Sequence, residues 1–519
     1  MCLIQFQYSK TGFSISNFIN GINAQSSRGS NPIKLYLETK EERKNPKLFD
    51  ILDPKLNSLK DVSFCIAHGR MATIDNHSSN HQPLFSRCRN YLISFNGTIF
   101  NYADIRDELR SHGVGFNSNG DTEVLLQSFI HWGYEGIKKL NGQFAFIIFD
   151  LKNKILHLSS DILGQDTLLY YEDNETFLVA SEFKAIFKAL PRIKKNIDLD
   201  FLSAYLFNNH SPRHVRGKTF YKNIKMLIPG EWLTFDLENH NIKTFTNENA
   251  NEYISQKPNI KELEGDINLA SKYSLTTDQK IGIELSGGID STLSSYLAYK
   301  EMLNSNKDIT FYTARVNENS NDFTYAKIFA KKLGIPLKIV DVSYDELALE
   351  SFNKLIKTVE IPMYLGGPSV SSNFLTEKIA NDGNSIAVSG TGGDELFCGY
   401  PRFYRTSLYL SKIYSLQFSE AAKFKELHKG KISLLNSIFK DSLKEIVSQS
   451  QILNSMYINN IIAPFMKKNY SLKDGDSLKL IDRILNKESS RLGYSNNKGI
   501  FETQKRDITD GAVPTWLHL

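Results

Sequence analysis

Two groups of residues in this chain could carry chemistry, one at its start and one near its middle. If Met1 is removed, Cys2 becomes an N-terminal cysteine whose free amine can serve as the general base for its own thiol. The second group, Ser286-Gly287-Gly288-Ile289-Asp290-Ser291, follows an apolar run. Its glycines let the backbone approach a phosphate, and Asp290 offers a carboxylate to a metal ion. We therefore expect two coupled reactions in one chain.

Residue types downstream of Cys2 fit an attack on the side-chain amide of an amino acid. Arg70 offers a guanidinium that can fork onto a substrate carboxylate. Asn96-Gly97 follows a predicted strand, where an amide side chain and a backbone N–H can form an oxyanion hole. Asp121 opens a predicted helix and offers a carboxylate to a substrate ammonium, although capping that helix is its ordinary role. Together with Cys2, which alone would be only a small strand residue, these parts describe hydrolysis of the glutamine side-chain amide.

The middle group has the pattern of a strand, a glycine-rich turn and a helix start. Residues 281–285 form the apolar strand, and the N–H groups at the start of the helix would face an anionic ligand. The turn lacks the lysine of the Gly-x-x-x-x-Gly-Lys-Ser/Thr loop. A second cluster, residues 389–395, has the sequence Ser-Gly-Thr-Gly-Gly-Asp-Glu, whose acidic pair would by itself be a helix cap. Together the two segments predict a pyrophosphate-binding site.

The elements that must position the first group mix strands and helices over about 190 residues. Strands are predicted at residues 91–95, before Asn96-Gly97, and at residues 143–150. Helices are predicted at residues 103–111 and 122–132. This mixture favours stacked sheets with helices outside.

The pattern of predicted strands and helices changes after about residue 190. Residues 191–260 indicate a connection with short strands, and from about residue 260 strands and helices alternate. The predicted strands are 280–285, 309–316, 336–342 and 385–388, with helices from 291 and over 322–333. Such alternation predicts a parallel, doubly wound sheet, followed by a mostly helical tail over residues 405–519. The predicted domains are 1–195, a connecting segment 196–260, and 261–519.

Composition restricts the class of protein. The chain has 519 residues, of which 41% are hydrophobic and 23% charged, without a long uncharged apolar segment, so we expect a cytoplasmic globular protein without a signal peptide or membrane span. The net charge of +5 is spread along the chain, which argues against a nucleic-acid binder. The four cysteines lack CxxC spacing, which argues against a zinc site or disulfide framework and leaves the Cys2 thiol reduced.

Several segments resemble the glutaminase domain of class II (Ntn-type) glutamine amidotransferases, specifically that of asparagine synthetases. The similar segments are Ala67-His68-Gly69-Arg70-Met71, Asn96-Gly97-Thr98-Ile99-Phe100-Asn101, residues 140–146 and residues 180–185. The turn at 286–291 is similar to the pyrophosphatase-type loop of ATP-dependent amide synthetases, and the 389–395 cluster resembles the second cluster of that family. Fainter similarity continues to the C-terminus, through residues 463–466 and 504–517.

The resemblance implies a fold and a set of roles. The fold would be α/β, with an Ntn-type αββα sandwich followed by a doubly wound synthetase domain of the adenine-nucleotide α-hydrolase type. Cys2 would be the nucleophile, Asn96 and Gly97 the oxyanion hole, and Arg70, Thr98 and Asp121 the glutamine-binding residues. ATP would be bound by Leu285, Ser286, Gly287, Gly288, Asp290, Ser291, Ser389 and Gly390. Asp290 and Asp394 would share Mg²⁺ on the pyrophosphate.

Departures from the family pattern concern the acceptor most. The chain has Thr98 and Thr391 where the family has Glu, and Asp482 or Arg483 falls near the position of an active-site lysine. The Arg-His-Arg-Gly-Pro-Asp stretch of the family is not recognisable between residues 25 and 60. Aspartate is the acceptor that the family implies, and a sugar uronic acid of a surface polysaccharide is the alternative that Thr391 favours.

Other classes of function stay open at this point. A non-catalytic sensor of glutamine or nucleotide would not need the nucleophile Cys2, and a ring-closing enzyme with an internal amine would not need Cys2 either. A homodimer is the assembly considered for the enzyme.

Overall fold

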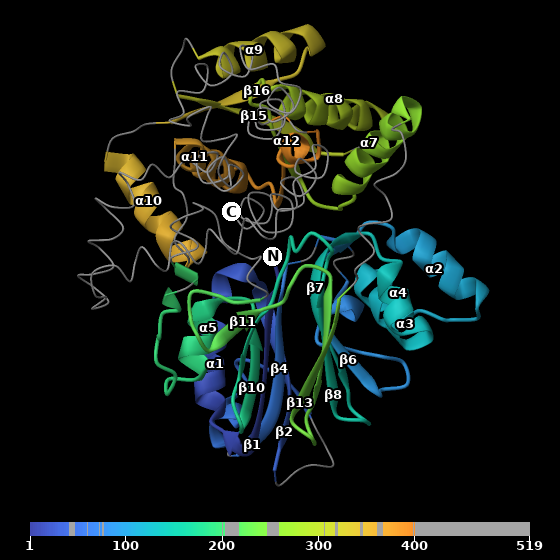
Figure 1. Cartoon of the computed structure of the whole chain (residues 1–519). Helices are drawn as coiled ribbons and strands as arrows, with labels where there is room; N and C mark the ends of the chain where they lie inside the picture. Colours follow the sequence, from blue (N-terminus) through green and yellow to red (C-terminus); the bar gives the residue numbers. More distant parts are fainter. Residues whose placement is uncertain are drawn as a thin grey trace, which may run out of the picture. The chain divides into compact units, whose positions relative to one another are not determined.

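The structure is a computed structural model of the chain (Figure 1). It describes residues 1–40, 47–59, 61–71, 73–74, 77–199, 201–202, 217–246, 259–305, 307–316, 320–342, 346–360, 367–397 and 399. The described residues fall into two compact units. The first holds those of 1–195 and 223–390, and the second holds those of 196–222 and 391–399. The predicted helical tail and its Asp482 and Arg483 lie outside the described residues.

The first sheet of the N-terminal part is antiparallel and has the order β11-β9-β10-β1-β4-β2-β3. Its strands are β1 (Leu3–Phe13), β2 (Ser30–Thr39), β3 (Lys47–Asp50), β4 (Val62–Arg70), β9 (Leu169–Glu172), β10 (Thr176–Ala180) and β11 (Ile224–Met226). β1 is central and pairs with β4 on one side and β10 on the other. The first residues of the chain therefore lie in the middle of a sheet.

The second sheet is also antiparallel, with the order β13-β12-β8-β7-β6-β5. Its strands are β5 (Leu84–Phe85), β6 (Tyr91–Ile99), β7 (Gly142–Asp150), β8 (Ile155–Ser160), β12 (Glu231–Asp236) and β13 (Asn241–Thr246). Strands from residues 224–246 thus extend both sheets. The predicted domain boundaries at 195 and 260 stay predictions.

Alternating side chains pack the two sheets face to face. Ile4 and Phe6 of β1 share one apolar core with Ile147 and Phe149 of β7, whereas Leu3 packs on the opposite face of its sheet. This alternation is the period of two that a strand imposes. The two sheets therefore enclose the main core, as the stacked-sheet prediction requires.

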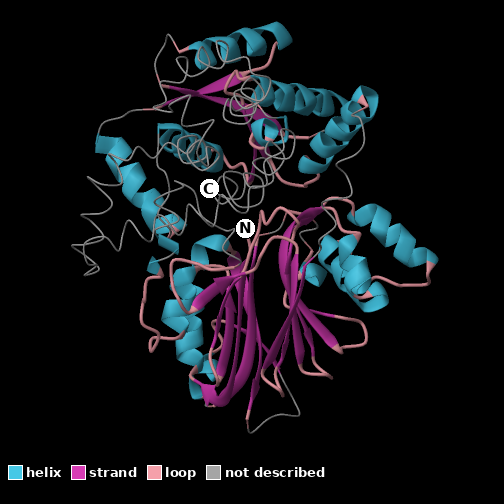
Figure 2. Ribbon diagram, viewed as in Figure 1, coloured by secondary structure: helices cyan, strands magenta, loops and turns pink. Residues whose placement is uncertain are grey.

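Helices cover the outer faces of the sandwich (Figure 2). The first sheet carries α1 (Ile15–Ala24) and α5 (Phe183–Ala189), and the second carries α2 (Tyr102–Ser111), α3 (Asp121–Trp132) and α4 (Tyr134–Lys138). Short 3₁₀ turns lie at Ser26–Arg28, Pro54–Ser58 and Ser78–Asn80. The layers are helix, sheet, sheet and helix, and the predicted αββα sandwich is confirmed.

One strand runs further than the sequence predicted. We expected the strand to end before Asn96-Gly97, a dipeptide that favours tight turns, but β6 continues to Ile99. Asn96 pairs with Ala145, Gly97 with Phe144 and Thr98 with Gln143 of β7. The long partner strand supplies these pairings, so tertiary context overrides the local turn preference.

A parallel sheet follows, with the order β16-β15-β14-β17 among the described strands. Its strands are β14 (Ile281–Glu284), β15 (Ile309–Arg315), β16 (Leu337–Asp341) and β17 (Ile386–Val388). Its helices are α7 (Ile260–Ser274), α8 (Ile289–Asn304), α9 (Asn321–Leu333), α10 (Glu346–Val359) and α11 (Gly367–Asn381), and α12 (Gly393–Phe397) follows in the second unit.

Helices lie on both faces of this sheet. Phe311 packs with residues of α8 and α9, whereas the adjacent Tyr312 packs with Leu375 and Ile379 of α11. Adjacent strand residues point to opposite faces, so the sheet is doubly wound, as predicted. The chain steps from β14 through β15 to β16 and then returns to β17 on the other side of β14. Ligands of such sheets bind where the strand order reverses, at the carboxyl ends of the strands.

Among the described residues, we find no helix with both the length and the apolar character that a membrane crossing requires.

The inter-sheet core predicts a large cost for truncating its aromatic rings. Phe149 is fully buried, and its ring centroid lies 4.8 Å from that of Phe64 and 5.9 Å from that of Phe6. Phe149→Ala should lower the free energy of unfolding by about 3–5 kcal/mol in urea unfolding. Phe245→Ala, at a ring that is 54% exposed, is the matched control and should change it by less than about 1 kcal/mol. Equal losses would contradict this assignment of the core.

Candidate active site

Cys2 directly precedes β1, and the strand register fixes its surroundings. Leu3 pairs with Gly69 of β4, so Cys2 lies beside the end of β4 and the residues that follow it. The thiol Sγ accepts a hydrogen bond from the backbone N–H of Met71 at 3.2 Å. Only 7% of Cys2 is exposed, and burial raises the pKa of its thiol, while the Met71 N–H and the nearby Arg70 lower it. The thiol is held in place and shielded from bulk water.

The α-nitrogen of Cys2 is bound by the side chain of Asn96. It donates a hydrogen bond to Asn96 Oδ1 at 2.5 Å, and both residues are buried. Asn96 belongs to β6 of the opposite sheet, so this bond joins the two sheets. The amide Nδ2 of Asn96 in turn donates to Asp166 Oδ1 at 2.7 Å. The nitrogen of Cys2, which would become a free amine on removal of Met1, is thus held by a buried side chain that is itself hydrogen-bonded.

Arg28 is a residue of this site that the sequence analysis missed. Its Nε donates to the Cys2 carbonyl oxygen at 3.3 Å, and its guanidinium lies 3.9 Å from Asp166 and 3.7 Å from Glu182. The Arg28-Gly29 pair lies in the stretch where we could not recognise the family motif. The Arg-Gly pair could have indicated Arg28 in the sequence. Only the contact of Arg28 with Cys2, which the structure shows, distinguishes this residue from a surface arginine.

Gly97 can be replaced by no other residue without moving the strands. Its φ is +136°, and a Cβ built on it would lie 2.0 Å from the carbonyl oxygen of Gln143. The backbone of β6 therefore approaches β7 closely at the point where the predicted oxyanion hole lies. Next to it, the Thr98 hydroxyl lies 3.3 Å from the Thr73 hydroxyl.

Arg70 and Asp121 are the predicted site residues of opposite charge. Arg70 ends β4, and its Nη2 donates to the Ile74 carbonyl at 3.2 Å. Asp121 begins α3, and its Oδ2 accepts from the Ile99 N–H at 3.0 Å. Burial raises the pKa of Asp121 to about 6, against the opposing effects of backbone N–H donors and Arg70. Arg70 lowers the pKa of both Cys2 and Asp121, so its positive charge acts on each of these two predicted residues.

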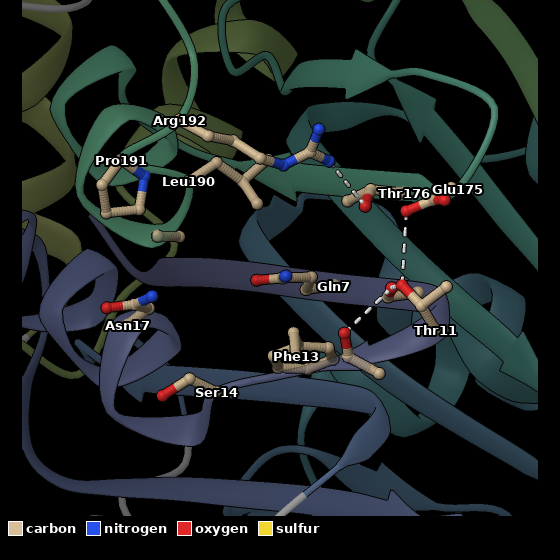
Figure 3. A pocket seen from close by; sticks show the side chains of 13 residues that line it. Gln7, Thr11, Phe13, Ser14, Asn17, Glu175, Thr176, Leu190, Pro191 and Arg192 are labelled. Carbon is tan, nitrogen blue, oxygen red and sulfur yellow. Dashed lines mark hydrogen bonds between the residues drawn. The ribbon is translucent and has the colours of Figure 1, made fainter.

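A cavity of about 370 Å³ lies elsewhere, on the outer face of the first sheet (Figure 3). Gln7 of β1 lies in its middle, with Asn17 of α1 on one side and Glu175 on the other. Arg192 on its rim donates to Thr176. The lining contains none of the predicted site residues, so this cavity is not the glutamine site.

The second predicted site lies at the carboxyl end of β14. The Ser286 hydroxyl lies 2.7 Å from that of Ser291 and accepts from the Gly288 N–H at 3.3 Å. Leu285 extends the ladder, because its N–H donates to the Tyr312 carbonyl at 2.8 Å. These bonds close the turn into a compact loop directly before α8.

Two glycines make this loop possible. Gly287 has φ +90°, and a Cβ on it would lie 2.2 Å from the Asp322 carbonyl oxygen. A Cβ on Gly390 would lie 2.5 Å from the backbone nitrogen of Ser291. Because β17 pairs in parallel with β14, Ser389-Gly390 follows the neighbouring strand and meets the loop. The structure thus joins both ATP-binding segments that the sequence predicted, at the point where the strand order reverses.

The structure gives the element and the exposure of each carboxylate that is predicted to bind magnesium. Asp290 is the second residue of α8 and is partly buried. Asp394 is the second residue of α12, after the exposed Thr391, in the second unit. Their sharing of one metal ion stays a prediction. Within the described ranges, we find no group of three or more His, Cys, Asp or Glu side chains that could hold a metal ion by themselves.

Two family models and several known proteins match this chain. The family model "Glutamine amidotransferase domain" matches residues 55–246, and the model "Asparagine synthase" matches residues 262–485. Asparagine synthetase (glutamine-hydrolyzing) 1 of Bacillus subtilis is 32% identical over 343 residues, which are 66% of this chain and 52% of that protein. The chain belongs to the asparagine synthetase family, with an N-terminal glutamine amidotransferase domain. The resemblance seen in the sequence is thereby confirmed.

Coverage differs among the relatives of this family. Asparagine synthetase (glutamine-hydrolyzing) 3 of Bacillus subtilis is 28% identical over 65% of this chain and 56% of its own length. The match spans little more than half of each of these two relatives. Putative asparagine synthetase (glutamine-hydrolyzing) 2 of Methanocaldococcus jannaschii is 25% identical over 83% of this chain and 88% of its own length.

The close approach at Gly97 gives a stability test of the site. Gly97→Ala should lower the free energy of unfolding by about 2 kcal/mol or more, because backbone strain and a clash with Gln143 act together. Gly113→Ala is the control, since Gly113 also has positive φ (+82°) but no heavy atom lies within 4 Å of the place that a Cβ would take. It should cost about 1 kcal/mol from strain alone. Similar values for both variants in urea unfolding would show that β6 does not approach β7 as described.

Proposed function

We propose that this protein is a glutamine-dependent amide synthetase that uses ATP. It would release ammonia from glutamine at Cys2, convert a carboxylate to an acyl-adenylate with release of pyrophosphate, and form an amide and AMP. The observation that carries the proposal is the arrangement at Cys2, where Asn96 holds the α-nitrogen at 2.5 Å and the Met71 N–H holds the thiol at 3.2 Å. A strand residue without chemistry would not need both groups positioned from opposite sheets.

The first half-reaction follows from these contacts once Met1 is removed. The α-amine of Cys2 takes the thiol proton, and the thiolate attacks the side-chain amide carbon of glutamine. Asn96 Nδ2 carries two hydrogens, so its bond to Asp166 leaves one for the oxyanion, with the Gly97 N–H as the second donor. The amine then gives its proton to the departing ammonia, and water hydrolyses the thioester to glutamate.

Glutamine would be oriented by the opposite charges of Arg70 and Asp121. Arg70 would pair with the α-carboxylate and Asp121 with the α-ammonium of glutamine. Asp121 must be ionised to do so, and an incoming ammonium stabilises the ionised form of this buried carboxylate. Thr98, where the family has Glu, offers a hydroxyl and no charge.

The second half-reaction would use the loop between β14 and α8. The loop leads into the start of a helix of 16 residues, and the dipole of that helix favours a bound anion at its N-terminus. The loop therefore fits a pyrophosphate group of ATP. Mg²⁺, held by Asp290 and Asp394, would neutralise the charge of that group. Both ATP and Mg²⁺ belong to this proposal.

Ammonia must reach the acyl-adenylate without meeting bulk water. In water near neutral pH it would be protonated, and ammonium cannot attack a carbonyl carbon. Exclusion of water also protects the adenylate from hydrolysis. We place the enzyme in the cytoplasm, where a reducing environment keeps the Cys2 thiol free.

The acceptor carboxylate is the open part of the proposal. Aspartate is the first candidate, because the relatives are named asparagine synthetases. A sugar uronic acid is the second, because Thr391 is an exposed, uncharged residue shortly before α12. Pyrophosphate release should be measured with glutamine, ATP, Mg²⁺ and each acid of a panel, with mass spectrometry of the products. Stimulation by aspartate alone would exclude the uronic acid, and no glutamate or pyrophosphate with any acid would exclude the enzyme.

Replacement of the nucleophile should separate the two half-reactions. Cys2→Ala should abolish glutamate formation, by at least about 10³-fold, and retain amide synthesis with added ammonia, because the second site does not use the thiol. Cys88→Ala is the matched control, since Cys88 is a free and exposed cysteine, and should keep both activities. If Cys2→Ala also stopped ammonia-dependent synthesis, the assignment of separate sites would be wrong.

Replacement of the loop carboxylate should have the opposite effect. Asp290→Asn should reduce pyrophosphate release by about 10²-fold or more and spare glutamine hydrolysis, because it removes a charge that would hold Mg²⁺. Asp308→Asn is the control: Asp308 pairs with Lys280 at 3.2 Å on the surface, beside the opposite end of β14. Glutaminase and synthetase rates should be unchanged in it. A normal rate of pyrophosphate release in Asp290→Asn would contradict the role of this carboxylate.

A further inference from the structure

Asp166 lies behind the catalytic centre in a tightly hydrogen-bonded loop between β8 and β9. Its side chain is 2% exposed. The neighbouring Asp161 carboxylate accepts hydrogen bonds from the backbone N–H groups of Leu163, Gln165 and Asp166 at 2.9, 3.1 and 3.2 Å. These bonds fix the loop backbone, so the carboxylate of Asp166 has little freedom to move.

The partners of Asp166 determine which way the Asn96 amide faces. Asp166 Oδ1 accepts from Asn96 Nδ2 at 2.7 Å, and the Gln143 side chain also donates to this carboxylate. An ionised carboxylate can only accept hydrogen bonds, so it excludes the flipped amide, in which two oxygens would face each other. Asn96 must then present Oδ1 to the α-nitrogen of Cys2, at the observed 2.5 Å.

We propose that Asp166 is a positioning residue for the nucleophile, which fixes the Asn96 amide so that its oxygen holds the α-nitrogen of Cys2 and its NH₂ group faces the oxyanion. The inference deepens the proposed function and rests on it for the identity of the reaction. Asp166 does not touch the substrate and acts through Asn96.

The charges around this network have opposite signs. Asp166 and the Arg28 guanidinium, 3.9 Å apart, both act on the α-ammonium of Met1, the residue before Cys2: Asp166 raises the pKa of that ammonium and Arg28 lowers it. Asp166 also raises the pKa of the Cys2 thiol, while Arg70 and the ammonium lower it. Glu182 faces Arg28 at 3.7 Å, and Asp161 lies behind Asp166. Burial raises the pKa of Asp166 itself, against Arg28, the ammonium and the two amide donors.

The kinetic test is Asp166→Asn, which keeps the shape of the side chain. An Asn–Asn pair allows both orientations of Asn96, so kcat for glutamine hydrolysis should fall about tenfold or more, as expected for loss of a charged hydrogen bond. KM for glutamine should change little, because Arg70 and Asp121 are untouched. Amide synthesis with added ammonia should keep its rate.

The matched control is Asp150→Asn. Asp150 is also a buried carboxylate, but it lies at the far end of β7 and binds Lys152 N, Asn153 N and the Asn153 side chain. This variant should lower the thermal unfolding temperature about as much as Asp166→Asn and leave kcat for glutamine unchanged. If both variants lost kcat equally, Asp166 would contribute only to the stability of the fold, and the proposal would be overturned.

A chemical test separates charge from packing and needs no glutamine turnover. The rate of alkylation of Cys2 by iodoacetamide is measured against pH by mass spectrometry of the N-terminal peptide, which also reports removal of Met1. Asp166→Asn should move the midpoint of this profile about one pH unit lower, because a negative charge is lost. Arg28→Gln should move it higher, because a positive charge is lost. Looser packing would instead expose the thiol and move both midpoints lower.

The kinetic and the alkylation measurements together distinguish failure of the positioning role of Asp166 from failure of the proposed function. Opposite shifts together with a loss of kcat in Asp166→Asn support the positioning role. Shifts of the same sign, or an unchanged kcat for glutamine in Asp166→Asn, overturn it. If the wild-type enzyme released no glutamate at all, the proposed function would fail, and the alkylation profiles would still decide whether Asp166 and Arg28 set the properties of Cys2.

Discussion

The pairing of β1 with β4 is the interaction on which the first site depends. The register that places Leu3 opposite Gly69 puts Cys2 beside Met71 and next to the end of the strand that carries Arg70. A shift of one residue would turn Leu3 and Ile4 to the wrong faces and move the thiol away from its donor. Because β1 is central, with β10 on its other side, that register is held from both sides. The apolar core and the position of Cys2 are thus fixed by one ladder.

Electrostatics at this site reflect a balance between burial and a few donors. Burial raises the pKa of both the Cys2 thiol and the Asp121 carboxyl, which disfavours their charged forms. Backbone N–H groups and Arg70 act in the opposite direction on both. In the proposed mechanism the buried thiol depends on the α-amine of Cys2 for activation, and Arg28 and Asp166, which act on the α-ammonium of Met1 in the intact chain, lie beside the same position.

The second site rests on close backbone approach. At the carboxyl ends of β14 and β17, Gly390 lies against the backbone of Ser291 in α8 and Gly287 against the backbone of α9 at Asp322, so neither position has room for a Cβ. The ligand that we propose for this site is an anion, which the start of α8 would favour. Close packing of these turns against α8 and α9 explains why the glycines stand at these positions in the sequence.

The sequence by itself determined the features that depend on local pattern. The glycine-rich turn after β14, the helices α2, α3 and α9 and the change from stacked to parallel sheets follow from residue types and periodicity, and the choice of Cys2 as the candidate nucleophile rests on residue type alone. Only the tertiary structure decided that β6 runs on through Asn96-Gly97, because the pairing partner is a distant strand. It also decided the set of Arg28, Asn96 and Asp166 around Cys2: Arg28 lies 26 residues from Cys2 along the chain, and Asn96 lies 70 residues from Asp166. Such contacts depend on strand register, and no local pattern of residues records it.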